Sequence, residues 1–167
     1  DYEEMKRLGI KTKLEYDGFK QEKDEMQSLG IETKIEFDLF KDSEDYKRCK
    51  SMGFKTKDDY YECKKMAGGD GTSFKSKAEY DNFKEKKDYV EMQGLKIRKK
   101  CDYDIFKASQ DYKQCKSMGF NTKADYDEFK EMGVSKKKEY DDFKNSSDYD
   151  DFKASGFKKK ADYELWN

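Results

Sequence analysis

The chain has 167 residues with 37 basic and 38 acidic side chains, which gives a formal net charge of −1, and it contains neither His nor Pro. The absence of His removes the commonest general acid–base catalyst, and the balanced charge removes the long-range attraction that drives nucleic-acid binding. The 13 Tyr, 12 Phe and 7 Met residues supply large apolar area, so we expect a folded core made mainly of aromatic rings.

A glycine followed by an apolar residue recurs along the chain, and most of the intervals between these glycines are 21 to 25 residues. The seven instances are Gly9-Ile10, Gly30-Ile31, Gly53-Phe54, Gly94-Leu95, Gly119-Phe120, Gly133-Val134 and Gly156-Phe157. Each glycine is predicted to end a helix in the left-handed conformation, with the next residue packed against the residue four before the glycine. Cys49 with Phe54 and Val90 with Leu95 are examples of the predicted apolar pair.

Helix starts are predicted shortly after these glycines, because a Thr or Ser is followed three residues later by an acid, as in a capping box. The motifs are TKLE (12–15), TKIE (33–36), TKDD (56–59), SKAE (76–79) and TKAD (122–125). Two aromatic residues three apart follow most starts, and this spacing places both on one helix face. We therefore predict an all-α chain of about eight short helix-turn-helix repeats, stacked as a solenoid or a compact helical bundle.

A longer period is visible in residues 45–60, DYKRCKSMGFKTKDDY, which recur as DYKQCKSMGFNTKADY at 111–126 with thirteen of sixteen positions identical. On this basis the chain divides into repeats at 1–44, 45–107 and 108–167. The second segment carries an inserted loop, GGDGTS, at 68–73, and the third ends in ADYELWN, which is compatible with a C-terminal capping repeat.

Metal and redox sites find little support. GGDGTS (68–73) and SSDYDD (146–151) lack the ligand spacing of an EF-hand loop. Cys49, Cys63, Cys101 and Cys115 form no CxxC pair, so the main interpretation is buried thiols that act as small hydrophobes, with disulfides as the alternative. We predict no catalytic residue, no cofactor-binding residue and no metal ligand.

Lys residues interleaved with Tyr and Phe keep single-stranded nucleic-acid binding open as an alternative, with KIRKKCDY (96–103) as the densest basic stretch. Acids precede twelve of the thirteen tyrosines, a context of tyrosine phosphorylation or sulfation, but the acid is better explained as part of a helix start. NSS (145–147) matches a glycosylation sequon.

The expected function is a non-enzymatic structural or scaffold protein that contacts other proteins or copies of itself, and a self-assembling filament or cytoskeletal component is one form of this role. No apolar run is long enough to span a membrane, so no membrane insertion is expected. The expected location is the cytoplasm, or the extracellular space if the chain is a processed fragment. The start at Asp1 in mid-pattern is compatible with a piece of a longer repeat protein.

Overall fold

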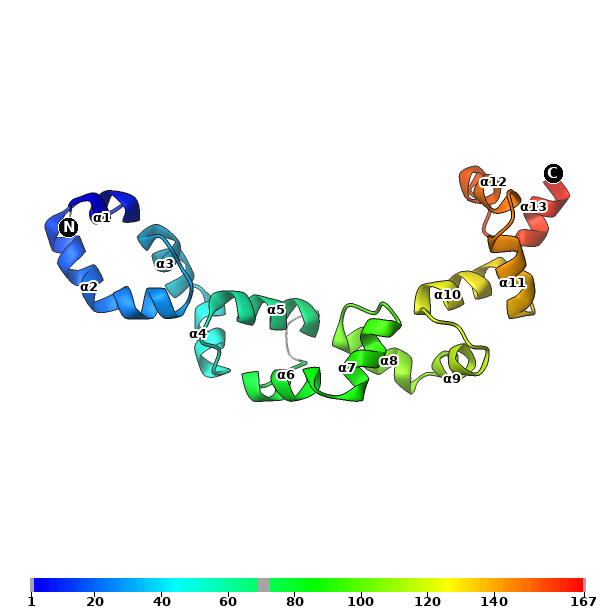
Figure 1. Cartoon of the computed structure of the whole chain (residues 1–167), viewed down its shortest axis with the longest axis horizontal. Helices are drawn as coiled ribbons and strands as arrows, with labels where there is room; N and C mark the ends of the chain where they lie inside the picture. The colour runs from blue at the N-terminus through cyan, green and yellow to red at the C-terminus, as the bar shows by residue number, and fades with distance from the viewer. Residues whose placement is uncertain (1, 69–72, 167) are drawn as a thin grey trace. The chain divides into compact units, whose positions relative to one another are not determined.

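A computed structural model describes residues 2–68 and 73–166 of the chain (Figure 1). In these residues the protein is all-α, with thirteen helices and no strand, which confirms the predicted fold class. The helices are α1 (Tyr2–Leu8), α2 (Lys13–Ser28), α3 (Lys34–Lys41), α4 (Glu44–Ser51), α5 (Lys57–Ala67), α6 (Lys77–Lys84), α7 (Lys87–Gly94), α8 (Lys100–Ala108), α9 (Gln110–Ser117), α10 (Lys123–Met132), α11 (Lys137–Lys144), α12 (Asp148–Ser155) and α13 (Lys160–Trp166).

The chain forms two compact units, each of which is described by itself. The first comprises residues 1–89 with 99–101, and the second comprises residues 90–98 with 102–167. The division at 1–44, 45–107 and 108–167 rests on sequence similarity between segments and stays a prediction. Most of the predicted inserted loop at 68–73 lies outside the described residues.

Side-chain caps begin the helices at all five predicted motifs. The backbone N–H of the acid three residues later donates to the Thr or Ser hydroxyl at Thr12, Thr33, Thr56, Ser76 and Thr122, over 3.1–3.2 Å. At Thr12 the box is complete, because the Glu15 carboxylate also accepts from the Thr12 backbone N–H over 3.0 Å. Each cap satisfies backbone groups that have no partner inside the helix.

Left-handed glycines end several helices as predicted. After α4, Gly53 has a φ of 81°, its N–H donates to the Lys50 carbonyl, and the Phe54 N–H donates to the Cys49 carbonyl over 3.0 Å. This pair of bonds defines a Schellman motif, and it recurs at Gly9, Gly30 and Gly119. Cys49 and Phe54 are both buried, so the predicted apolar contact accompanies this turn.

The prediction for Gly94 is wrong. Gly94 is the last residue of α7, and Lys96, with a φ of 56°, takes the left-handed position instead. The Ile97 N–H donates to the Met92 carbonyl over 3.0 Å, so the buried pair is Met92 with Ile97, while Val90 is 68% exposed. The turn begins two residues later than expected because Met92 and Ile97 can bury their side chains there, and this burial compensates for placing a non-Gly residue at positive φ.

Aromatic rings form the core of each unit. A short repeat is a pair of successive helices, such as α3 with α4 or α8 with α9. The first helix of the pair buries two aromatic residues three positions apart, which are Phe37 and Phe40 in α3 and Tyr103 and Phe106 in α8. The second aromatic meets a tyrosine six residues later edge-to-face, with ring centroids 5.8 Å apart for Phe40 and Tyr46. Such pairs stabilise a core beyond the burial of area alone.

Main-chain hydrogen bonds also join successive repeats. The first N–H of α5, from Lys57, donates to the Leu29 carbonyl at the end of α2, and Lys77 of α6 donates likewise to Met52 after α4. In the second unit Lys123 of α10 donates to the Leu95 carbonyl over 3.2 Å. A helix start thus satisfies the end of an earlier helix, so neighbouring repeats support one another.

Candidate functional site

The second unit carries a regular arrangement of tyrosine hydroxyls, carboxylates and lysines. Glu91 at the end of α7 accepts from the Tyr103 hydroxyl over 2.8 Å, from Tyr112 over 2.9 Å and from the Lys116 ammonium over 2.8 Å. Glu128 of α10 is bonded in the same way by Tyr140, Tyr149 and Lys153, residues that follow it by 12, 21 and 25 positions. These carboxylates therefore connect three helices each.

The pKa shifts of the groups in these networks agree with a structural role, in which each carboxylate joins three helices. Burial raises the pKa of Glu91, but hydrogen bonds from Lys116, Tyr103 and Tyr112 together lower it to about 2. Burial raises the pKa of the Tyr149 hydroxyl to about 12, with a further contribution from the hydrogen bond to Glu128. Both groups therefore keep fixed protonation states near neutral pH, so they act as structural links and are not placed to transfer protons.

A second regular contact pairs an acid with a lysine that follows it at a fixed interval, 19 positions later. Lys64 of α5 donates to both oxygens of Asp45 over 2.7 and 2.8 Å, and Lys130 of α10 donates to both oxygens of Asp111 over 2.8 and 2.9 Å. Lys41 with Glu22 and Lys144 with Asp125 form the same pair. Sequence reasoning missed these contacts, although their constant interval is visible in the sequence.

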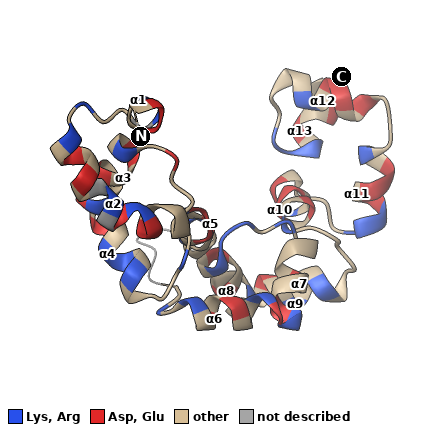
Figure 2. Cartoon of the chain, turned by 60° about the vertical axis from the view of Figure 1, so that its left-hand side comes forward, with Lys and Arg blue, Asp and Glu red and all other residues tan. Residues whose placement is uncertain are grey.

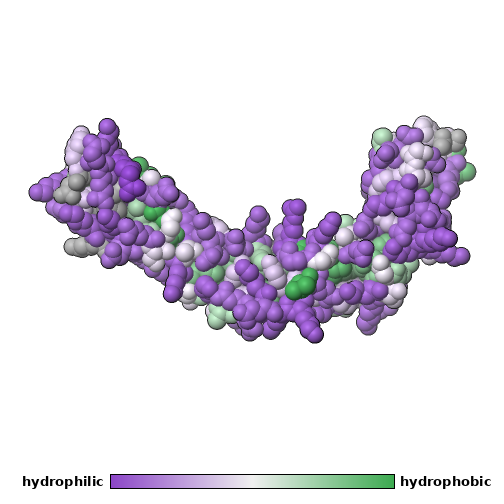
Figure 3. Space-filling view, viewed as in Figure 1, coloured by the Kyte–Doolittle hydropathy of each residue, from purple (hydrophilic) through white to green (hydrophobic). Residues whose placement is uncertain are grey.

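Exposed aliphatic side chains recur at one position of the repeat, the sixth residue of the first helix. Leu39 in α3, Ile105 in α8 and Leu165 in α13 are 73%, 72% and 88% exposed. The intervening repeats carry polar residues there, such as Asn82 in α6 and Asp142 in α11. Figure 3 shows that hydrophilic residues dominate the visible face and that hydrophobic ones are scattered among them.

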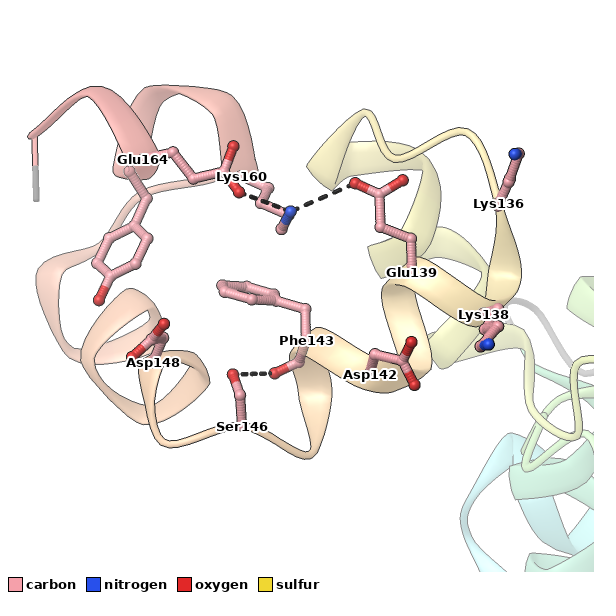
Figure 4. Close-up of a pocket in the computed structure, with 10 residues that line it drawn as sticks. Lys136, Lys138, Glu139, Asp142, Phe143, Ser146, Asp148, Lys160 and Glu164 are labelled. Carbon is pink, nitrogen blue, oxygen red and sulfur yellow. Dashed lines mark hydrogen bonds and ion pairs between the residues drawn. The ribbon is translucent and has the colours of Figure 1, made fainter.

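Two open cavities occupy equivalent places between the first helices of adjacent repeats. One, of about 550 Å³, lies between α2 and α3 and is lined by Glu15, Glu22, Lys34, Ile35 and Asp38, among others. The other, of about 600 Å³, lies beside α11, α12 and α13 (Figure 4). Phe143 and Tyr163 line the second cavity together with Asp142 and Asp148.

The cysteines do not assemble a site in the structure. Cys49, Cys63 and Cys115 are buried free thiols, and Cys101 is half-buried. Burial raises the pKa of Cys63 to about 11, which makes its thiol a poor nucleophile. Among residues 2–68 and 73–166, no group of three potential ligands is placed to hold a metal ion.

The lysines and aromatic rings on which the nucleic-acid alternative depends are largely engaged within the protein. Lys57 lies 5.5 Å from the centre of the Phe40 ring and also pairs with Glu36, and Lys123 lies 5.2 Å from the Phe106 ring. Figure 2 shows acidic and basic residues interspersed along the helices. An ammonium that neutralises a nearby carboxylate offers little attraction to phosphate.

A comparison of the chain with protein-family models, curated proteins and solved structures finds no match. No helix in the described part of the chain is both long enough and apolar enough to cross a membrane. The features of the structure that could serve a function are the recurrent exposed aliphatic residues and the two cavities between repeats.

Proposed function

We propose that the protein is a non-enzymatic scaffold whose repeats present a surface to other proteins or to further copies of the chain. The observation that carries this proposal is the recurrence of Leu39, Ile105 and Leu165 at one helix position, with each side chain mostly exposed. These residues contribute little to the core. Each exposes apolar area, and burial of such area favours association with another protein.

The spacing of these residues favours a partner that is itself repetitive. The interval from Leu39 to Ile105 equals the interval from Tyr46 to Tyr112, which are equivalent residues in the two copies of the DYK motif. A partner that repeats the same kind of exposed aliphatic residue can make the same contact at more than one repeat, which raises its apparent affinity without any new type of contact. A further copy of the chain has that interval, so self-association is the first form of the function to test.

Sedimentation velocity over a concentration series tests this proposal. We expect the wild-type chain to form larger species as its concentration rises, and a triple variant, Leu39→Gln, Ile105→Gln and Leu165→Gln, to remain monomeric. Val90→Gln is the matched control, because Val90 is an exposed aliphatic residue outside the recurrent position. A wild-type chain that stays monomeric, or a triple variant that associates as well as wild type, contradicts the self-associating form.

The nucleic-acid alternative is tested separately by fluorescence anisotropy with a labelled single-stranded oligonucleotide. Electrostatic binding to phosphate weakens steeply with salt, so the measurement is most sensitive at low ionic strength. We expect no saturable binding even there. Saturable binding that weakens as salt is added would support the alternative instead of a scaffold.

A further inference from the structure

A motif of three residues closes the boundary between successive repeats around one aromatic ring. The Tyr46 ring packs edge-to-face on Phe40 with centroids 5.8 Å apart. The Lys57 ammonium, from the first residue of the next repeat's helix α5, lies 5.5 Å from the centre of the same ring and pairs with the Glu36 carboxylate. Covered by these two side chains and its own repeat, Phe40 is only 4% exposed.

The same motif recurs at the same sequence intervals in the described chain. The further instances are Phe83 with Tyr89 and Lys100, Phe106 with Tyr112 and Lys123, and Phe143 with Tyr149 and Lys160. Their ring centroids are 5.8–6.1 Å apart, and the ammonium groups lie 5.2–5.4 Å from the phenylalanine rings, which are 4–8% exposed. Figure 4 shows the instance at Phe143, where Lys160 also pairs with Glu139 over 3.3 Å.

Helix α13 carries the aromatic residue of this motif without the tyrosine and the lysine. Trp166 is the seventh residue of α13, as Phe143 is of α11. The Trp166 ring contacts Phe157, with centroids 5.7 Å apart, but it is 66% exposed, against 8% for Phe143. Asp162, the equivalent of Glu139, is exposed, and no basic side chain in the described part of the chain pairs with it.

Helices α1 and α2 carry the other two residues of the motif without the aromatic residue. Tyr2 precedes Lys13 by the same interval that separates Tyr46 from Lys57. Tyr2 is 75% exposed, whereas Tyr46 is half-buried. Lys13 is exposed, and within residues 2–68 and 73–166 its ammonium pairs with no carboxylate and no ring. The two surfaces therefore hold complementary halves of one motif.

We propose that the protein associates head to tail, with α1 and α2 of one copy docked on α13 of a second copy. The Tyr2 ring packs on the Trp166 ring of the second copy, and Lys13 lies over that ring and pairs with Asp162. The boundary between repeats thereby continues from one copy to the next. This inference rests on the scaffold function and names a contact through which the chain self-associates.

The aromatic pair dominates the expected affinity of this contact. Trp and Tyr side chains that become buried at the centre of an interface carry most of its binding energy. An ion pair near the rim, such as that of Lys13 with Asp162, contributes little affinity but helps to fix the register of the two copies. The two copies use different surfaces, so the contact leaves one free surface of each kind for a further copy.

Tryptophan fluorescence over a concentration series tests the contact, because Trp166 is the only Trp in the chain. We expect its emission to move to shorter wavelength as the wild-type concentration rises, with the midpoint that sedimentation gives for association. Tyr2→Ala should raise this midpoint about tenfold, and Lys13→Glu should raise it about fivefold. Lys55→Glu, the same charge change at an exposed lysine before α5, is the matched control and should leave it unchanged.

A charge-swapped variant separates the contact from any effect on folding. Asp162→Lys alone should weaken association as Lys13→Glu does, because each places like charges opposite one another. The double variant Lys13→Glu with Asp162→Lys restores opposite charges between copies, so its midpoint should return close to the wild-type value. A loss of stability in either single variant would not be repaired in this way.

The outcomes distinguish this contact from the scaffold function on which it rests. Association without a change in Trp166 emission, a Tyr2→Ala variant that associates as well as wild type, or a charge-swapped variant no better than the single ones would overturn the head-to-tail contact and leave the scaffold function standing. A wild-type chain that stays monomeric would overturn the contact together with the self-associating form of the function.

Discussion

Single residues decide where the helices end, and the turn after α7 is the informative case. Residues 25–31 read EMQSLGI and residues 91–97 read EMQGLKI, so Lys96 is equivalent to Gly30 and Gly94 is equivalent to Ser28. A search for glycine alone places the turn two residues early. Alignment of these two segments places it correctly, because it keeps the apolar residues Met92 and Ile97 at the positions of Met26 and Ile31.

Substitution of these residues should have opposite effects. Gly53→Val forces a β-branched residue into a φ of 81° and should lower the free energy of unfolding by about 1–2 kcal/mol or more. Lys96→Gly should raise it by about 1 kcal/mol, because glycine adopts the left-handed conformation without steric cost. Urea unfolding followed by circular dichroism measures both changes. Equal stabilities of the two variants would contradict the assigned turns.

Gly94→Ala is the matched control for these turns. Gly94 lies in α7 outside the positive-φ region, and no heavy atom lies within 4 Å of an added Cβ. The substitution should therefore stabilise the protein by about 0.5–1 kcal/mol, the advantage of Ala over Gly in a helix. A loss of stability would indicate that Gly94, and not Lys96, occupies the turn.

The carboxylate of Glu91 should make stability depend on acid pH. Its pKa in the folded chain, about 2, lies below the ordinary value of 4.5, so its contribution is complete above pH 4.5 and is lost as the pH falls towards 2. Glu91→Gln should lower stability at pH 7 by about 1 kcal/mol, with a difference from wild type that shrinks over that range. Unfolding curves at several pH values measure it, and the exposed Glu62→Gln provides the control. A difference that is constant from pH 7 to pH 2 would contradict the role of Glu91.

At the scale of the helix, the sequence predicts where the first helix of a repeat starts better than it predicts where that helix ends and the second helix begins. The Thr or Ser motifs predicted five starts because a cap is a local contact between residues three apart. The junction inside a repeat was less predictable. Ser43 and Ser109 cap α4 and α9, whereas the equivalent part of the first repeat, after Lys20, has no Ser, and α2 continues through it for 16 residues.

Caps inside the repeat should matter only where the hydroxyl is bonded. The Ser109 hydroxyl accepts from the Tyr112 N–H over 3.2 Å, while Ser147 precedes α12 in a helical conformation and makes no such bond. Ser109→Ala should therefore lower the free energy of unfolding by about 1 kcal/mol. Ser147→Ala should change it by less than about 0.5 kcal/mol. Thermal unfolding measures both, and similar losses would contradict the assigned caps.

The candidate sites were less accessible to sequence reasoning than the helices. Hydrogen bonds from Tyr103 and Lys116 to Glu91 join residues that are far apart in the sequence, and no local pattern indicates such contacts. Their signal is repetition of the same intervals at Glu128.

At the scale of the whole molecule, stability must come from contacts between repeats. Most of the described helices are short, as α1 with 7 residues and α5 with 11 residues illustrate. An isolated helix becomes marginally stable in water only at roughly 12–15 residues. Helices such as α3 and α8 bury one stripe of aromatic residues, and α4, α7 and α9 each bury a single Cys or Met side chain, so each helix needs its neighbours to cover this apolar surface. The fold is thus an all-α array in which local sequence sets the turns and distant residues provide the stability.

A peptide that carries one repeat should therefore not fold alone. Residues 99–120 include α8 and α9 with the Tyr103, Phe106 and Tyr112 rings, yet Glu91 and the α10 helix start lie outside this range. We expect circular dichroism of this peptide to show little helix at room temperature, in contrast to the full chain. Full helicity of the isolated peptide would show that neighbouring repeats are not required.

Backbone chemical shifts of the full chain, with the ³J coupling between the amide and α protons, test the account most directly. The account predicts helical shifts over α1 to α13, with a break at each left-handed residue, including Lys96 and excluding Gly94. Extended or random-coil shifts across these helices, or a left-handed Gly94 beside a helical Lys96, would contradict it.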